Sequence, residues 1–151
     1  MTKTERAWLA GFFDGEGCVH TGKSSSSKHY RLCIKIGQSF PGVLYYIKDL
    51  LGYGQVRSYY TKLYPAHFLD LHSKDEHIKF IKTILPYSIV KKEQLETALE
   101  FLQNVHDKPH GHRYLSKKQA KNREKLGNLI IKLKHEEPVN AKTYVSSRRS
   151  S

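Results

Sequence analysis

The most informative part of this sequence is Leu9-Ala10-Gly11-Phe12-Phe13-Asp14-Gly15-Glu16-Gly17. An apolar helix is expected to end here in a run that alternates small and acidic residues, which places a carboxylate at the helix end. Because Ala10, Gly11 and Gly15 lack bulky side chains, two such helices can approach closely and bring two carboxylates together around a shared metal ion. Nine residues alone also fit an amphipathic helix with a glycine cap. The rest of the chain must therefore decide between the two interpretations.

The composition indicates a polyanionic partner. The 151 residues include 26 Lys and Arg against 14 Asp and Glu, which gives a formal net charge of +12. This excess favours nucleic acid, because binding releases the counterions condensed on the phosphates. The sequence has no long apolar run, signal-peptide pattern or lipidation pattern. We therefore expect no membrane partner, and an intracellular protein at DNA, in a bacterial or archaeal cytoplasm or an organelle matrix.

The cysteines and histidines do not predict a structural metal site. Cys18 and Cys33 are the only cysteines, and an intracellular setting favours two reduced thiols over a disulfide. Of the nine histidines, His106, His110 and His112 lie close together in the sequence. No cysteine lies near them and the segment has the composition of a loop, so we do not expect zinc there.

The spacing of apolar residues predicts an α+β fold. Thr4 is the expected N-cap of the first helix, which ends at Gly15 and Gly17. The elements that follow are strand, strand, helix, strand, strand and three helices, over residues 18–21, 31–36, 40–51, 55–60, 67–71, 74–85, 91–105 and 116–135. An antiparallel sheet with helices on one face accounts for this order.

Alternating side chains give the predicted sheet two different faces. In residues 31–36, three aliphatic side chains alternate with Arg31, Cys33 and Lys35. In the next pair of strands, Gln55, Arg57 and Tyr59 share one side. One face therefore packs against the helices, and the other is basic and aromatic.

The predicted elements form a single domain over residues 1–137. Residues 138–151 are rich in Asn, Ser, Thr and Arg without a core-forming pattern, which predicts a flexible basic tail. The sequence has no internal repeat, so the stretch at residues 9–17 occurs once.

Residues 9–17 resemble the signature of the LAGLIDADG homing endonucleases, with Phe12 and Phe13 at the variable apolar positions, Gly15 at the variable small one and Glu16 at the penultimate acid. The order of elements is similar to that of the single-motif members. The resemblance implies the αββαββα LAGLIDADG fold, with a saddle-shaped antiparallel sheet covered by helices on one face, plus C-terminal helices. It implies an endonuclease that binds a long pseudo-palindromic double-stranded target in the major groove and hydrolyses both strands.

A homodimer also follows from the resemblance. A complete active centre needs two motifs, so a chain with one motif must pair with itself. The motif helices form the dimer axis in this family, which implies an interface of Ala7, Ala10, Gly11 and Asp14. We expect Asp14 to satisfy backbone donors near the helix ends and not to bind the metal.

Glu16 is the expected metal ligand. Phosphodiester hydrolysis needs an activated water and stabilisation of charge on the phosphorane and the leaving 3′ oxygen, which divalent ions provide. Carboxylates are natural ligands of Mg²⁺, so we expect Mg²⁺ or Mn²⁺ at Glu16. The resemblance adds the Gly15 carbonyl as a co-ligand. A solvated acid at a helix end is the alternative for Glu16.

Two further catalytic positions are carried over from the family. Gln38 matches a polar residue that orients the water network around the scissile phosphate, and its offset from Lys35 predicts a bend or bulge in the strand. The alternative for Gln38 is a turn residue that caps the next helix. Lys91 matches a lysine that stabilises charge in the transition state, with Lys92 as its rival. A basic residue that some relatives carry after the glutamine is replaced here by Phe40-Pro41-Gly42.

The polar face of the sheet and its loops supply the expected DNA contacts. Arg and Lys pair with guanine and Gln pairs with adenine, so this set can read base edges as well as phosphates. The expected contacts are His20, Lys23, Lys28, His29, Arg31, Lys35, Gln55, Arg57, Tyr59, Lys62 and His67.

Two other functions remain open at this point. An intron maturase of the same fold would bind intron RNA through its basic surface, with or without cutting DNA. A DNA-binding regulator would keep the sheet without the carboxylate, and the presence of Glu16, Gln38 and Lys91 together argues against it.

Overall fold

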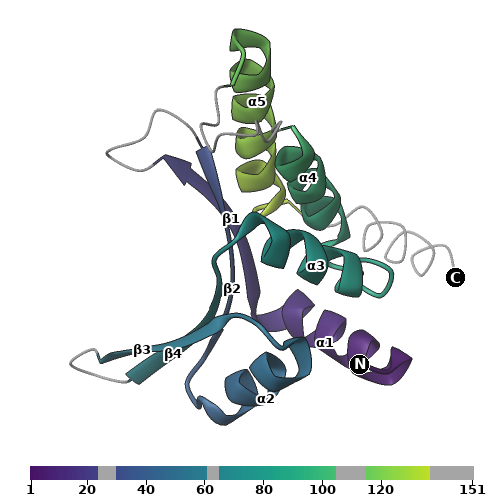
Figure 1. Ribbon diagram of the computed structural model, residues 1–151, viewed down its shortest axis with the longest axis vertical. Coiled ribbons are helices and arrows are strands. Elements are labelled where there is room, and N and C mark those ends of the chain that lie inside the picture. Colours follow the sequence, from purple (N-terminus) through teal and green to yellow (C-terminus); the bar gives the residue numbers. More distant parts are fainter. Residues whose placement is uncertain (24–29, 61–64, 105–114, 137–151) are drawn as a thin grey trace, which may run out of the picture. The chain divides into compact units, whose positions relative to one another are not determined.

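The computed structural model describes residues 1–23, 30–60, 65–104 and 115–136 (Figure 1). The elements in these ranges are α1 (Lys3–Glu16), β1 (Gly17–Lys23), β2 (Tyr30–Gln38), α2 (Gly42–Leu51), β3 (Gln55–Tyr60), β4 (Pro65–Leu71), α3 (Lys74–Ile84), α4 (Lys92–Gln103) and α5 (Lys117–Leu133). The expected order of elements is confirmed. Lys28, His29, Lys62, the three clustered histidines and the tail at 138–151 lie outside the described residues.

The four strands form one sheet in the order β1-β2-β4-β3. Strand β4 pairs antiparallel with both of its neighbours, and Ile36 and Val56 both lie opposite Leu69. Because successive side chains point to opposite faces, this register places Ile34, Ile36, Leu69 and Leu71 together on one face. All four are buried, so this is the face that packs against helices.

The chain separates into two compact units. The first unit comprises Met1–Cys18 and Cys33–Ile89, and the second comprises Val19–Leu32 and Val90–Ser151. Each is described here by itself, and the expectation of one domain over residues 1–137 stays a prediction.

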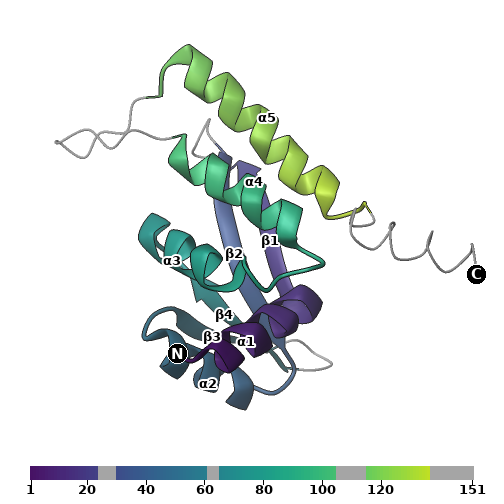
Figure 2. The same cartoon turned by 90° about the vertical axis from the view of Figure 1, so that its right-hand side faces the viewer.

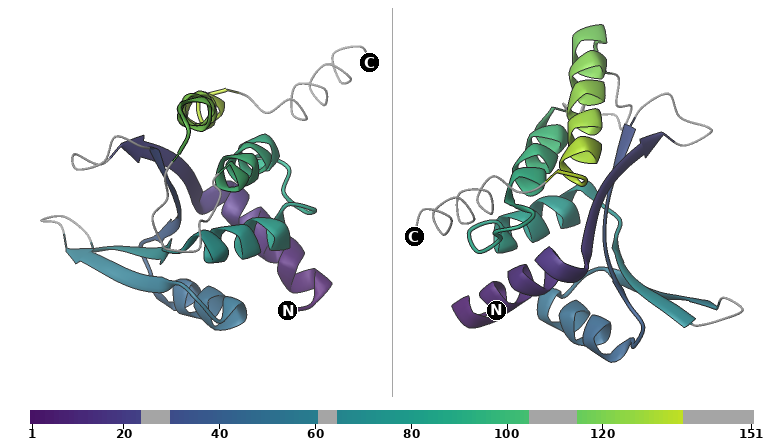
Figure 3. Two further views of the ribbon diagram at one scale, coloured as in Figure 1. Left: turned by 45° about the horizontal axis from the view of Figure 1, so that its top comes forward. Right: turned by 180° about the vertical axis from the view of Figure 1, so that it is seen from behind.

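Helices α1, α2 and α3 cover the apolar sheet face of the first unit, and α2 lies beside β3 and β4 in both views of Figure 3. Phe13 of α1 meets Phe80 of α3 edge to face, with ring centroids 5.0 Å apart, and neither ring has exposed surface. Burial of such aromatic side chains dominates the energetics of a core. The contact fixes α1 against α3.

Helix α1 begins two residues earlier than expected. Thr2 is the N-cap, because its hydroxyl accepts from the Glu5 N–H while the Glu5 carboxylate accepts from the Thr2 N–H at 2.6 Å. This reciprocal capping box needs an acidic or amide side chain three residues after the cap. Thr4, the expected cap, is followed at that distance by Ala7, which cannot return the bond.

The end of α1 also differs from the expectation, because Gly15 lies inside the helix and Glu16 is its last residue. Gly17 forms the C-cap in an extended conformation, and its N–H donates to the Phe13 carbonyl oxygen. A Cβ atom at Gly17 would collide with the Phe13 ring. Glycine therefore lets the chain pass directly from helix into β1.

The second unit contains α4 and α5, which lie side by side in Figure 2, together with most of β1 and the start of β2. Gln94 of α4 donates to the Ile130 carbonyl oxygen at 3.1 Å, and Thr21 of β1 donates to the Gly127 carbonyl oxygen at 2.8 Å. A Cβ atom at Gly127 would lie 3.1 Å from the Tyr30 ring, so glycine allows the close approach of α5 to the strands.

A buried histidine links the stability of the first unit to pH. His77 of α3 is 4% exposed, and its Nε2 lies 3.0 Å from the Leu71 carbonyl oxygen. Burial lowers the pKa of His77 from its ordinary value of 6.5, while the bond to Leu71 and the nearby Glu76 oppose the shift. Between pH 6.5 and the lowered pKa, the unfolded chain binds more protons than the folded one. The contribution of neutral His77 to stability is therefore complete above pH 6.5 and is lost as the pH falls from 6.5 to the lowered pKa.

We expect His77→Gln to flatten the pH dependence of unfolding. Glutamine keeps an N–H donor for the Leu71 carbonyl but does not titrate. Between about pH 7.5 and about pH 5, the wild type should lose stability relative to the variant by at most about 1.4 kcal/mol per pH unit. Urea unfolding of both proteins at several pH values measures this difference. Parallel curves for the two proteins would show that His77 is not the linked group.

Candidate functional site

Glu16 occupies the last turn of α1, where its side chain is exposed. Within the described residues no hydrogen bond or ion pair engages its carboxylate. Gly15 is exposed as well, and a Cβ atom there would meet nothing within 4 Å. A carboxylate and a backbone carbonyl are both hard oxygen donors of the kind that Mg²⁺ binds while it keeps several waters. The donor set therefore fits a divalent metal, with the remaining ligands to come from elsewhere.

Asp14 is engaged inside its own protomer. One carboxylate oxygen accepts from the Ser88 hydroxyl at 2.6 Å, and the other accepts from the Ile89 N–H at 2.7 Å. Ser88 and Ile89 follow α3, so Asp14 joins the end of α1 to the segment that leaves α3. The Asp14 carboxylate therefore satisfies a backbone N–H donor and connects two segments of the chain.

Small residues form a stripe along the outside of α1. Ala7, Gly11 and Gly15 are exposed and lie four residues apart, so they share one side of the helix. A Cβ atom at Gly11 would also meet nothing within 4 Å. Ala10, by contrast, has no exposed surface and faces its own core, about 100° around the helix from Gly11, so it does not belong to this stripe.

Gln38 lies within β2 and not beyond it. The antiparallel register with β4 runs without interruption from Ile34 to Gln38, which lies opposite His67, so the expected bulge is wrong. Strict alternation holds and places Gln38 on the face of Ile34 and Ile36, with its side chain half-buried. Gln38 and Glu16 both belong to the first unit.

His67 was expected beside Arg57, and that face assignment is wrong. Ser58, and not Arg57, lies opposite His67 in the register of β3 and β4. His67 is 8% exposed and its Nδ1 lies 2.8 Å from the Ser58 hydroxyl. It stabilises the pairing of the two strands on the helix-covered face.

Lys91 belongs to the second unit, where it is the N-cap residue of α4. Its side chain is half-buried, whereas Lys92 is exposed on the first turn of the helix. Both lysines remain candidates for the catalytic position.

The open face of the sheet in the first unit is organised around Arg57. The guanidinium donates to the Gln55 side-chain oxygen at 3.2 Å, lies 3.4 Å from the His72 ring nitrogen, and has an ion pair with Asp70 at 3.7 Å. Arg57 and its neighbour Gln55 are both exposed. The Arg57 guanidinium therefore holds its N–H donors in a fixed position beside the Asp70 carboxylate and the Gln55 amide. Arginine and glutamine are side chains that can pair with the edges of guanine and adenine.

An aromatic cluster continues this face. The Lys35 ammonium lies 4.8 Å from the centroid of the Phe68 ring, and the Tyr59 ring meets Phe68 edge to face at 5.8 Å. Sequence reasoning missed Phe68, Asp70 and His72. For Phe68 and Asp70 the signal was present, because both alternate with the apolar Leu69 and Leu71.

Among the described residues of the second unit, the expected DNA contacts are exposed. These are His20, Lys23 and Arg31. Lys23 is also paired with Glu124 of α5 at 3.2 Å and lies over the Tyr30 ring at 4.8 Å. Exposed ion pairs of this kind contribute little, so Lys23 can exchange this partner for a phosphate.

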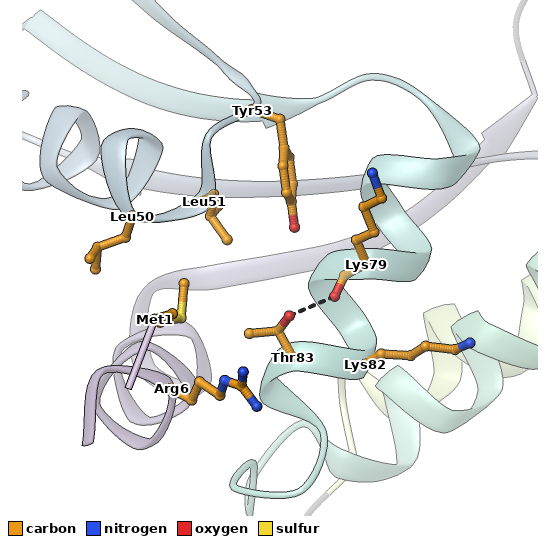
Figure 4. Close-up of a pocket in the computed structure, with 8 residues that line it drawn as sticks. All are labelled: Met1, Arg6, Leu50, Leu51, Tyr53, Lys79, Lys82 and Thr83. Carbon is orange, nitrogen blue, oxygen red and sulfur yellow. Dashed lines mark hydrogen bonds between the residues drawn. The ribbon is translucent and has the colours of Figure 1, made fainter. Parts of the chain in front are cut away.

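A pocket of about 400 Å³ lies between α1, α2 and α3 in the first unit (Figure 4). The Tyr53 hydroxyl points into it, and burial raises the pKa of Tyr53 to about 12, so the phenol stays protonated. The Thr83 hydroxyl donates to the Lys79 carbonyl oxygen at 2.8 Å, while the Lys79 and Lys82 ammonium groups point away from it. The pocket holds none of the expected catalytic residues.

Two negative findings apply to the described ranges. They hold no group of three or more His, Cys, Asp or Glu side chains placed to hold a metal ion. No helix among them is long and apolar enough to cross a membrane.

The exposed carboxylate at the end of α1 and the cationic, aromatic sheet face together define a nucleic-acid-processing domain of the α+β class. Comparison with protein families gives the finer assignment. The LAGLIDADG endonuclease family matches residues 9–97, which is more than half of the chain, so the chain belongs to this family. It is therefore an endonuclease of the LAGLIDADG type.

Solved structures show the same fold. The homing endonuclease I-CvuI, in complex with its target in the presence of calcium, has a TM-score of 0.70 at 20% identity, with 89% of this chain and 84% of that chain covered. The archaeal intron-encoded I-Vdi141I, complexed with DNA, has a TM-score of 0.67 at 22% identity, with 86% and 84% covered.

A longer relative matches over part of its length. I-GzeII in complex with its DNA target has a TM-score of 0.68 at 22% identity, with 85% of this chain but only 44% of that chain covered. Among curated proteins no match was found.

Proposed function

We propose that the chain is a homodimeric, site-specific endonuclease that uses Mg²⁺ to cut both strands of an extended, pseudo-palindromic DNA target, within the compartment that holds this DNA. The observation that carries the proposal is the end of α1. There Glu16 is exposed and unengaged among the described residues, next to a stripe of small side chains. Two copies of that stripe in contact would bring two Glu16 carboxylates together.

The small stripe supports the dimer. Ala7, Gly11 and Gly15 leave open space along the exposed side of α1, so the backbones of two helices can approach closely. The fold covers only 44% of I-GzeII, which leaves room in that chain for a second half of similar size. A chain with one motif would obtain its second half from another copy.

Each active-site residue has a distinct part in the proposed reaction. Glu16 would hold the divalent ion with the Gly15 carbonyl, and the bound ion would supply an activated water and charge stabilisation. Asp14 keeps α1 in position through Ser88 and Ile89. Gln38 would orient water near the scissile phosphate, and Lys91 or Lys92 would stabilise the developing negative charge.

The open sheet face would read the target. Arg57 is held by Gln55, Asp70 and His72, which reduces the entropy it loses when it pairs with a guanine. The aromatic cluster of Tyr59 and Phe68 lies beside it and offers apolar contacts to thymine methyl groups. Intron RNA stays a predicted second partner for the maturase alternative.

Selection of bound and cleaved sites from a random duplex library tests this function. The wild type should enrich a two-fold related sequence of about 20 base pairs, two helical turns. Arg57→Ala should lose the preference at one position in each half-site, a loss of about 1–3 kcal/mol in discrimination. Arg6→Ala, which removes an exposed arginine from α1, is the matched control and should keep the wild-type profile. Identical profiles for all three proteins would exclude the assignment of this face.

A further inference from the structure

Helix α5 carries a row of lysines that the active site and the open sheet face do not use. Lys117, Lys118, Lys121 and Lys125 are all exposed, and no ion pair engages them in the described part of the chain. At about 100° per residue the four fall within an arc of about 100° on the helix. The buried residues Leu126, Gly127 and Ile130 lie on the other side. We name these four residues the α5 lysine row.

The acidic side chain of α5 does not offset the positive charge of this row. The only acid of α5, Glu124, is already paired with Lys23, and the lysine in the last turn, Lys132, is paired with Glu136 at 3.4 Å. The neighbouring helix α4 has the opposite composition, with Glu93, Glu96 and Glu100. A general need for solvation would not separate the two signs between two adjacent helices, so the row indicates an anionic partner.

The row borders the strand pair that carries the proposed DNA contacts. Asn128 lies two helical turns after Lys121 on the same side of α5, and its side chain accepts from the Tyr30 hydroxyl at 2.9 Å. Arg123 also donates to the Tyr30 carbonyl oxygen at 3.1 Å. These bonds hold α5 against the start of β2 at Tyr30. The row is therefore continuous with the end of the β1–β2 pair.

A recess beside the row adds neutral donors. It measures about 620 Å³ and is lined by Lys118, Lys121 and Lys125 together with Asn104, Gln119 and Asn122. No carboxylate lines it. Ammonium and amide groups without an acid suit phosphate oxygens, which carry most of the affinity of proteins for DNA.

The position of the row along β1 indicates which part of the DNA it meets. Strand β1 starts at Gly17, directly after Glu16, and ends at Lys23, which pairs with α5. The row is therefore attached to the last residue of a seven-residue strand whose first residue follows the proposed metal ligand. An extended strand rises about 3.3 Å per residue, so we expect the row to meet phosphates away from the cleaved ones.

We propose that the α5 lysine row binds the phosphate backbone of duplex DNA that flanks the target, independently of its sequence. The proposal rests on the homodimeric function above. Its partner is duplex DNA, because α5 contacts Lys23, an expected DNA contact of the same unit, and the row carries the charge complementary to phosphate.

The test is the salt dependence of binding by the triple variant Lys117→Gln, Lys121→Gln, Lys125→Gln. Each neutralised phosphate contributes about 0.9 to the slope of log K against log salt, so the slope should fall by up to about 2.7 per protomer. Two duplexes are compared, the target alone at about 20 base pairs and the target with about 15 base pairs added on each side. We expect the loss on the flanked duplex and little loss on the short one.

A variant with the same loss of charge elsewhere is the control. Lys48→Gln, Lys79→Gln, Lys82→Gln removes three positive charges from α2 and α3 of the first unit. It should leave the slope for both duplexes close to that of the wild type. Equal slopes for both triple variants would show that net charge alone acts, and would overturn the proposal.

The remaining outcomes are equally decisive. An equal loss on the short and the flanked duplex would place the contacts within the target and overturn the assignment to the flanks. If the triple variant lost affinity for structured RNA but kept its affinity for flanked DNA, the proposed DNA partner would be wrong and RNA would take its place. If the triple variant binds the target specifically with the salt slope of the wild type, the proposal for the α5 lysine row is wrong and the homodimeric function is unaffected. If the wild type binds no target specifically but the triple variant still has a reduced slope on an unrelated long duplex, the homodimeric function is wrong and the proposal for the row is unaffected.

Discussion

Replacement of Glu16 by glutamine should lower cleavage of the target by at least about a hundredfold while binding is retained. The side chain is exposed at the last residue of α1 and engages no partner in the described part of the chain, so the change removes charge without disturbing the fold. Cleavage is measured under single-turnover conditions in Mg²⁺, and affinity is measured in Ca²⁺. Chelation of the metal should stop the wild type.

The matched control for this prediction is Glu96→Gln on α4. Glu96 is also an exposed helical glutamate, so the two variants lose the same charge from comparable surroundings. Only the variant at position 16 should lose cleavage. A Glu16→Gln protein that cuts at the rate of the wild type would remove Glu16 from the metal site.

Local sequence signals located the exposed acidic end of α1 but not the residues that contact it in the fold. The alternation of small and acidic residues identified Glu16, because that pattern is contained within nine consecutive positions. The bonds of Asp14 to Ser88 and Ile89 join positions more than seventy residues apart, and no local pattern encodes them. The sequence therefore indicated the type of residue at position 14, whereas only the fold shows which residues it contacts.

Strand register explains the errors on the sheet. Alternation within one strand predicted correctly that Gln55, Arg57 and Tyr59 share a face. It could not relate one strand to the next, because the face of a residue depends on the pairing register. His67 was therefore placed on the open face although it lies opposite Ser58, and a bulge was expected before Gln38 where the ladder is regular.

The aromatic surface between α1 and α2 was likewise invisible from the sequence. Trp8 stacks on Phe12 with centroids 5.4 Å apart and meets Tyr46 edge to face at 5.5 Å. Trp8 and Tyr46 remain 39% and 49% exposed. Helical spacing places Trp8 next to Phe12, but only the packing of α2 against the rest of the first unit brings Tyr46 to them.

The second large effect is expected at Gly11, where stability and activity should change in opposite directions. A side chain at this position meets nothing in its own protomer, and leucine has a helix propensity better than that of glycine by nearly 1 kcal/mol. Gly11→Leu should therefore fold at least as stably as the wild type. In a dimer built on the small stripe, however, the leucine would hold the two helices apart and separate the paired Glu16 carboxylates.

We accordingly expect Gly11→Leu to be a monomer that does not cut either DNA strand, with a free energy of unfolding equal to or above that of the isolated wild-type protomer. Sedimentation velocity with and without DNA measures assembly, and urea unfolding measures stability. Gly42→Leu is the control, since Gly42 also lies in a helix with nothing within 4 Å of a Cβ atom, but on α2. A dimeric, fully active Gly11→Leu protein would place the dimer axis elsewhere, because close packing of two α1 helices leaves no room for the leucine.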